Sequence, residues 1–391
     1  MSKERVHEWD VIRGIAFLAI VLQHSIGQFA YRKDTSLLDA YTLAATYHFI
    51  KFGVPAFVLL TGAALVYNHY GTLNYPKFIR KRSIDILIPY FLWTVIYYVT
   101  MFPGKSINIE WFKNVGQQVI APTLGYHFWF IIMIFQFYLL FPLFLKGLAW
   151  AIRRRDQNEV STLNPLLVLT ALGYMFLLGY MFLMWVSYKY LPSHASSYPS
   201  FMQYLITNRN SNFLFYSFYF IFGAVIAIEL ERWRKIIKRS FRWNLILLIV
   251  AYGWAGYELF IGTGYNLPIN LNWSTTLKPS MFMLVFAELI ALYMIGMKVA
   301  QTKNRLQALT AWIGKYSYGA YLVHALLLGQ LIIVIDAFVL IYPALKQHYV
   351  LVTFGAFLIV AVVSTLTCFM LSKIPFGRYL TGPTGVKKKL V

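Results

Sequence analysis

The sequence predicts an all-α integral membrane protein with about ten transmembrane helices and both termini in the cytoplasm. The chain has 391 residues, of which 59% are hydrophobic and 13% are charged, whereas an ordinary soluble domain has roughly 45–50% apolar and about 25% charged residues. Apolar segments of about 20 residues, the length that crosses a bilayer, recur along the whole chain. The third observation is that connecting segments rich in Lys and Arg alternate along the chain with connecting segments that contain few of them.

Ten segments are expected to span the membrane, and each is continuous enough in apolar residues to form a helix. They lie near residues 11–30, 45–68, 84–102, 127–149, 164–186, 211–229, 243–261, 279–297, 316–340 and 350–372. Gly53, Pro55 and Pro89 interrupt the second and third segments. Breaks of this kind persist in a membrane only where protein or water satisfies the freed backbone groups. We therefore expect a polar cavity beside the first segment.

The formal charge of +21 follows the predicted topology. Of the 35 Lys and Arg residues, 25 fall in the N-terminal segment and every second connection after it, nine fall on the opposite side, and Arg13 is the remaining one. This bias is the one that the positive-inside rule predicts for an N-terminus in the cytoplasm. The charge is therefore attributed to membrane topology, and we expect membrane lipids rather than nucleic acid as partners.

The chain is organised as one membrane unit over residues 1–373, followed by a short basic cytoplasmic tail over residues 374–391. No internal repeat is visible. Cys368 is the only cysteine, so the sequence predicts neither a disulfide framework nor a thiolate metal cluster. The longer outer loops, near 103–126, 187–210 and 262–278, are rich in Gly, Pro, Ser and Asn. They are expected either to cover an outward cavity or to rest against lipid headgroups.

Arg13 and His24 lie within the first apolar segment. A cation in a membrane helix costs roughly 2.5–3.5 kcal/mol on insertion scales, so such a residue indicates a functional site. Eleven residues are close to three helical turns, so both side chains face the same way, about 16 Å apart along the axis. We predict that both line one polar chamber, with the His24 imidazole as a general base. The alternative is a packed histidine bonded to a neighbouring carbonyl.

A basic loop precedes the third segment and contains Lys77, Arg80, Lys81 and Arg82. The simplest interpretation is a topological anchor. The functional alternative is a phosphate clamp formed by Arg13, Arg80 and Arg82, because guanidinium groups match phosphate geometry and stay charged. A thioester donor built on coenzyme A carries phosphates of this kind. No metal-ligand spacing and no Gly-x-Ser-x-Gly elbow occurs in the sequence.

Four further residues are candidates for the acceptor site or its cavity: His127, Trp129, His324 and Glu288. His127 and Trp129 either belong to an interfacial aromatic belt or line an acceptor site, since aromatic faces stack on sugar rings. His324 is expected at a depth similar to His24, and its alternative role is a structural hydrogen bond. Glu288 lies near a segment centre and needs a partner or a proton there. It is expected to balance Arg13 or to orient a histidine.

These residues together resemble the acyltransferase-3 family of multispanning membrane O-acyltransferases. The matching motifs are Asp10-x-x-Arg13-Gly14 with His24, Phe52-x-Val54-Pro55-x-Phe57 with Thr61-Gly62, Arg80-x-Arg82 with Leu87-x-Pro89-Tyr90, Trp129-Phe130, and Ser317-Tyr318-Gly319-x-Tyr321-x-x-His324. The arrangement also resembles members linked to intercellular-adhesin polysaccharide synthesis. Asp85 departs from the pattern, because relatives often carry a basic residue there.

The resemblance implies a membrane acyltransferase domain over residues 1–373 in a multi-pass protein of the bacterial cytoplasmic membrane. It implies transfer of an acetyl or succinyl type of group from acyl-CoA, as a co-substrate and with no bound cofactor, to hydroxyls of a cell-surface glycan or exopolysaccharide. Cell-envelope polysaccharide biosynthesis proteins are the expected protein partners. The alternative function is export or transport of a polysaccharide or small solute, since intramembrane polar groups and broken helices also suit transporters.

Overall fold

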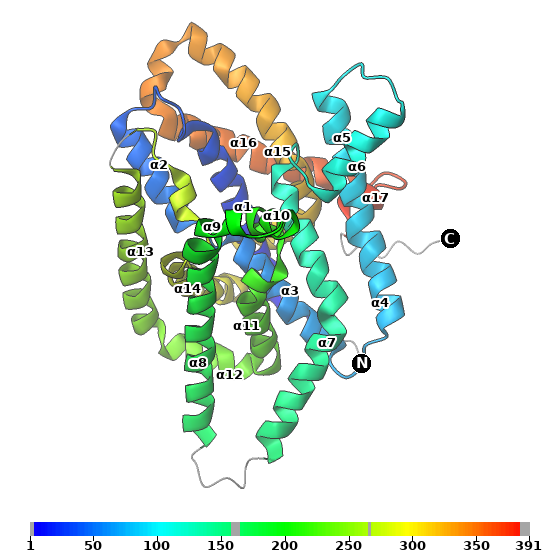
Figure 1. The fold of residues 1–391 in the computed structure, drawn as a ribbon, viewed down its shortest axis with the longest axis vertical. Helices are drawn as coiled ribbons and strands as arrows, with labels where there is room; N and C mark the ends of the chain where they lie inside the picture. Colours follow the sequence, from blue (N-terminus) through cyan, green and yellow to red (C-terminus); the bar gives the residue numbers. More distant parts are fainter. Residues whose placement is uncertain (1–3, 158–164, 265–266, 384–391) are drawn as a thin grey trace.

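The computed structural model describes residues 4–157, 165–264 and 267–383. Over these residues the chain is helical and contains no strand (Figure 1), which confirms the all-α prediction. The helices are α1 (His7–Phe29), α2 (Leu37–Phe49), α3 (Gly53–His69), α4 (Tyr75–Arg82), α5 (Ile88–Met101), α6 (Ile109–Ile120), α7 (Trp129–Gln157), α8 (Pro165–Trp185), α9 (Leu191–Ser193), α10 (Ser200–Thr207), α11 (Ser217–Ile228), α12 (Leu230–Arg239), α13 (Phe241–Thr263), α14 (Pro279–Thr302), α15 (Arg305–Ile341), α16 (Tyr349–Leu371) and α17 (Arg378–Thr381).

Within the described residues, eight helical stretches are long and apolar enough to cross a membrane. The number is nine if α11 and α12, which meet at an angle of 106°, form one broken span. The ten predicted segments all fall on helical parts of the chain, although some are divided between two elements, and the segment near 164–186 matches the 21-residue helix α8 (Pro165–Trp185). The multispanning architecture is therefore confirmed. The cytoplasmic location of the termini stays a prediction.

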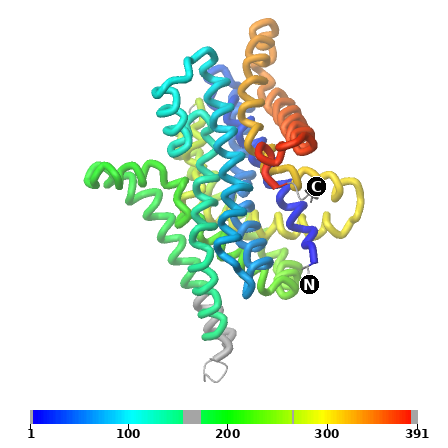
Figure 2. The backbone as a smooth tube through the Cα atoms, turned by 90° about the vertical axis from the view of Figure 1, so that its right-hand side faces the viewer, coloured from blue at the N-terminus to red at the C-terminus, as the bar shows by residue number. Residues whose placement is uncertain are grey.

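Helices α1 and α15 pack backbone to backbone at two glycines. A Cβ atom on Gly14 would lie 2.1 Å from the carbonyl oxygen of Thr310, and one on Gly314 would lie 2.2 Å from the carbonyl oxygen of Asp10. Only glycine permits this approach, which small residues typically provide between membrane helices. Helix α16 packs along both α1 and α15, and α15 and α16 run together toward one end of the molecule (orange in Figure 2).

The crossing point sets the register of the two helices. His24 follows Gly14 by ten residues, and His324 follows Gly314 by ten residues. Because both the glycines and the histidines meet, α1 and α15 run in the same direction. Equal offsets from one crossing point place the two imidazoles at the same height, about 15 Å further along the axes.

A second glycine contact joins α3 to α11. A Cβ atom on Gly62 would lie 2.1 Å from the carbonyl oxygen of Phe220, and one on Gly223 would lie 1.9 Å from that of Leu59. Helix α3 also packs against α1, so α11, α3, α1 and α15 form a continuous series of neighbours. The buried aromatic and aliphatic side chains of these helices form one core.

The stretch predicted as the second span is broken between α2 and α3. Residues 50–52 are not helical, as the interruption at Gly53 and Pro55 predicts. The side chain of Gln23 on α1 donates a hydrogen bond of 2.5 Å to the carbonyl of Ile50 at the break. This contact satisfies a backbone group that lipid would leave unpaired.

The third predicted span starts with a distortion. Residues Ser83–Leu87 form a π-helical turn between α4 and α5, and such turns are frequent at functional sites. Asp85, which is buried in this turn, forms an ion pair with Arg378 of α17. The side-chain N–H of Trp93 donates a 2.9 Å hydrogen bond to the carbonyl of Leu380. These two contacts hold the segment after α16 against the π-helical turn and α5.

Replacing Gly14 with Ala tests the α1–α15 crossing. The added methyl group collides with the Thr310 carbonyl, so we expect a loss of about 1–3 kcal/mol in unfolding free energy, the usual cost of overpacking. The measurement is thermal unfolding of the purified protein in detergent. Gly27→Ala on the same helix is the control, because a Cβ there meets no atom within 4 Å. Equal melting temperatures for both variants would contradict a tight crossing.

Candidate functional site

Three histidines from separate elements form a cluster beside α1. They are His24 of α1, His324 of α15 and His127 of the short 3-10 turn Tyr126–Phe128. The ring centroids of His24 and His324 lie 4.9 Å apart, those of His127 and His324 lie 4.8 Å apart, and those of His24 and His127 lie 5.9 Å apart. His324 and His127 are buried, whereas His24 is partly exposed.

Hydrogen bonds connect two of these imidazoles. Nδ1 of His24 lies 2.7 Å from Nε2 of His324, and Nδ1 of His324 lies 2.6 Å from the carbonyl oxygen of Tyr321. The Tyr321 hydroxyl in turn donates to the carbonyl of His127. Neither ring nitrogen of His127 has a hydrogen-bond partner within the described part of the chain, although a buried polar group normally requires one.

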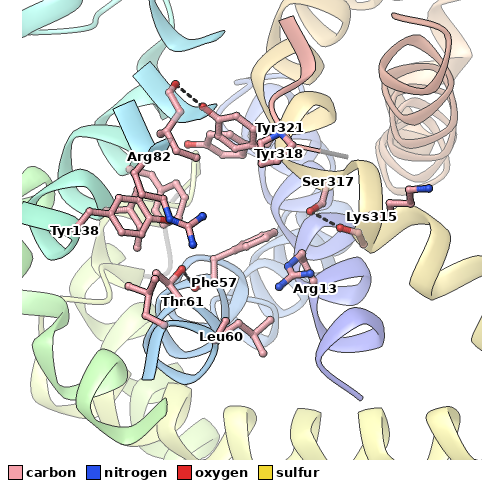
Figure 3. Close-up of a pocket in the computed structure, with 17 residues that line it drawn as sticks. Arg13, Phe57, Leu60, Thr61, Arg82, Tyr138, Lys315, Ser317, Tyr318 and Tyr321 are labelled. Atoms are coloured by element: carbon pink, nitrogen blue, oxygen red, sulfur yellow. Dashed lines mark hydrogen bonds between the residues drawn. The ribbon is translucent and has the colours of Figure 1, made fainter. Parts of the chain in front are cut away.

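A first cavity, here called the arginine cavity, has a volume of about 280 Å³. Figure 3 shows the guanidinium groups of Arg13 and Arg82 on facing sides of it, whereas the Lys315 ammonium points away. The other lining residues come from α3, the π-helical turn, α7, α15 and the segment after α17. They are Phe57, Leu60, Thr61, Ala64, Leu65, Ile86, Phe130, Ile134, Tyr138, Gly314, Ser317, Tyr318, Tyr321 and Pro383.

Arg82 is held by aromatic rings. Its guanidinium carbon lies 5.4 Å from the ring centroid of Phe78 and 5.3 Å from that of Tyr138, within the range of cation–π attraction. Arg13 lies 3.3 Å from a carboxylate oxygen of Asp10. Arg80, the third residue of the predicted phosphate clamp, is exposed and does not line the cavity. The structure therefore brings together two of the three arginines.

A second cavity, here called the histidine cavity, has a volume of about 240 Å³ and is lined by His24 and His127. Its other lining residues are mainly aromatic, hydroxyl and amide side chains, with Lys51 as a cation: Ile20, Gln23, Tyr47, Lys51, Val54, Trp129, Asn210, Tyr216, Leu271, Asn272, Thr275, Thr276 and Tyr321. Several belong to the loops predicted on the outer side near 187–210 and 262–278. Residues of these two loops therefore line a cavity, whereas the outward orientation of the cavity stays a prediction.

Arg13 and His24 do not line one chamber, so the prediction of a shared cavity is wrong in this detail. Arg13 lines the arginine cavity and His24 lines the histidine cavity. Both cavities have Tyr321 in their walls. The helical spacing placed the two residues correctly on one helix, but it contains no information about the side chains of other helices that line the space beside each of them.

The other candidates from the sequence fall into two groups. His127 and Trp129 line the histidine cavity, whereas His324 and Glu288 line neither cavity. His324 lies behind His24 and is at the same depth, as expected. Glu288 is buried, and neither carboxylate oxygen has a hydrogen-bond partner within the described residues. Among the described residues Glu288 therefore makes no hydrogen bond that would balance Arg13 or orient a histidine, the two roles expected for it.

Sequence reasoning missed Lys51 and Tyr321 as cavity residues. Lys51 lies at the break between α2 and α3, with its ammonium 3.1 Å from the Tyr47 hydroxyl, and a cation beside a broken helix was a usable signal. Tyr321 occurs in the motif that ends at His324, one turn before it. Nothing in the sequence indicates that this residue lines two cavities.

Comparison with known proteins identifies the family of the chain. The family model Acyl_transf_3, described as "Acyltransferase domain", matches residues 6–373. The chain is also similar to "Putative membrane-bound acyltransferase YfiQ" of Bacillus subtilis (strain 168), with 20% identity over 386 residues, which cover 97% of this chain and 94% of that protein. No solved structure matches. The chain therefore belongs to the Acyl_transf_3 family and is a membrane-bound acyltransferase.

Proposed function

We propose that this acyltransferase moves an acyl group of acetyl or succinyl type from acyl-CoA to hydroxyl groups of a cell-surface glycan or exopolysaccharide. The observation that carries the proposal is the pair of cavities that share Tyr321 as a lining residue: one presents two guanidinium groups, and the other presents the His24 imidazole. A donor with phosphates and an acceptor with hydroxyls need these two environments.

The arginine cavity suits the donor. Arg13 and Arg82 offer planar, permanently charged groups to the phosphates of coenzyme A. Arg13 and His24 are eleven residues apart on one helix, about 16 Å along the axis. An extended pantetheine arm is long enough for that distance, so phosphates held near Arg13 are compatible with a thioester near His24.

The histidine cavity suits a carbohydrate. Trp129, Tyr47 and Tyr216 supply aromatic faces, which stack on sugar rings, and amide and hydroxyl side chains supply hydrogen-bond partners. Under the predicted topology the N-terminal end of α1 lies in the cytoplasm. The donor cavity then faces the compartment that makes acyl-CoA, and the acceptor cavity faces the outer side of a bacterial cytoplasmic membrane, where cell-envelope polysaccharide proteins work.

The reaction needs one base and no further reactant. His24 takes the proton from the acceptor hydroxyl while the hydroxyl oxygen attacks the thioester carbonyl carbon. The tetrahedral intermediate then collapses, the carbon–sulfur bond breaks, and the coenzyme A thiolate receives the proton from His24. The products are the ester and free coenzyme A, and His24 returns to its neutral form.

Replacing His24 with Ala tests the base. We expect acyl transfer from labelled acyl-CoA to fall by about 10²–10⁴-fold, the usual contribution of general-base catalysis, with normal membrane insertion. The assay uses purified protein with a glycan acceptor. His194→Ala, at an exposed histidine that lines neither cavity, should retain full activity. Undiminished transfer by the His24 variant would remove the base from the mechanism, and glycan flux without acylation would instead support an exporter.

Replacing Arg82 with Gln tests the donor cavity. Loss of a charge-assisted phosphate contact of about 1.5–3 kcal/mol should raise the KM for acyl-CoA by at least about tenfold, with a smaller change in kcat. Arg80→Gln should have a smaller effect, because this exposed side chain lies outside the cavity. Lys77→Gln is the charge-matched control on α4. If all three variants bind acyl-CoA equally well, the basic loop serves as an anchor alone.

A further inference from the structure

We propose that His324 is a positioning residue that fixes the tautomer of His24 and so leaves Nε2 of His24 as the basic nitrogen. This inference rests on the proposed role of His24 as general base. It assigns to His324 a function other than contact with the acceptor, and it follows from the order of donors and acceptors in the chain Tyr321–His324–His24.

The series of hydrogen bonds starts at the backbone carbonyl of Tyr321, which can act only as an acceptor. A backbone carbonyl oxygen accepts hydrogen bonds and does not donate them. Nδ1 of His324 lies 2.6 Å from the Tyr321 carbonyl oxygen, so Nδ1 carries the hydrogen. A neutral imidazole holds one N–H, which leaves Nε2 of His324 as an acceptor.

The second link fixes His24. Its Nδ1 lies 2.7 Å from Nε2 of His324, and because that nitrogen accepts, Nδ1 of His24 donates. The remaining lone pair of His24 is on Nε2. Since His24 lines the histidine cavity, Nε2 is the nitrogen available to a bound hydroxyl. The other tautomer would place two lone pairs against each other at 2.7 Å.

His324 is held firmly enough for this task. It is fully buried, its carbonyl partner is three residues earlier on the same helix, and the edge of the Phe17 ring packs against it with centroids 6.4 Å apart. His127 contacts both imidazoles but hydrogen-bonds to neither, so it does not compete for the lone pair of His324. The described residues contain no group of three His, Cys, Asp or Glu side chains arranged to hold a metal ion.

The hydrogen-bond chain Tyr321–His324–His24 also explains how His24 can carry a positive charge during the reaction. When Nε2 takes the proton from the acceptor, the resulting imidazolium still donates from Nδ1 to the neutral His324. A charge-assisted hydrogen bond is stronger than a neutral one, so the contact strengthens as the charge develops. His324 itself neither gains nor loses a proton and does not touch the substrate.

The direct test is the tautomer of His24 in the full-length protein in lipid nanodiscs. With ¹⁵N-labelled histidine, the nitrogen chemical shifts distinguish a protonated from an unprotonated ring nitrogen, and the His24 signals are identified by their loss in His24→Gln. We expect a protonated Nδ1 and an unprotonated Nε2. In His324→Leu, which removes the acceptor, the preference for Nδ1–H should be lost.

Kinetics provides the second test. His324→Leu should lower kcat by about 100-fold, the usual effect of misplacing a catalytic group, while the KM for acyl-CoA changes by less than about twofold. His324→Gln should recover most of the activity, because its amide oxygen can accept from Nδ1 of His24. The control is His48→Leu, which removes another buried histidine with a hydrogen bond, 2.8 Å to Ser274, outside both cavities.

The two tests distinguish failure of the proposed positioning role of His324 from failure of the proposed acyl-transfer reaction. If His24 of the wild-type protein carries its proton on Nε2, the positioning role of His324 is contradicted, whatever reaction the enzyme catalyses. Equal kcat values for wild type and His324→Leu also overturn it, as does a His324→Gln variant as inactive as His324→Leu. If the tautomer is as expected and no acyl-CoA is consumed, the proposed function fails and the hydrogen-bond chain stands.

Discussion

The close crossing of α1 and α15 is the constraint on which the candidate site depends. At Gly14 and Gly314 the two backbones touch, and no side chain separates them. From that point both helices rise in parallel, so equal distances along the sequence become equal heights. The contact between His24 and His324 is a direct result of this register, and Arg13 next to Gly14 reaches the same cavity as Ser317 for the same reason.

Tyr321 has three roles that follow from its place one turn before His324. Its carbonyl accepts the hydrogen bond of His324, its hydroxyl donates to the carbonyl of His127, and the residue contributes to the walls of both cavities. The geometry of the histidine pair and the walls of both cavities therefore involve the same residue.

Much of the architecture could be predicted from the sequence, and the limits have physical causes. Apolar length located the long helices, of which eight or nine within the described residues could cross a membrane, and helical periodicity put Arg13 and His24 on one helix. Tertiary relations escaped this reasoning: the sequence does not tell which helix faces His24, because that depends on two glycines 300 residues apart. Arg80 and Arg82 both lie in α4, where two residues of a regular helix point about 200° apart, so the sequence predicts that they face different ways but does not tell which of them faces the cavity.

The fastening of the segment after α16 has a consequence for biosynthesis. Pro383 belongs to the wall of the arginine cavity, and it is held there through the ion pair of Arg378 with Asp85 and the hydrogen bond from Trp93 to Leu380. The ribosome synthesises the segment that leads to Pro383 only after it has synthesised α16. A nascent chain with every helix up to α16 inserted in the bilayer would still lack this part of the wall of the arginine cavity, so the cavity is completed only after α16 has been synthesised.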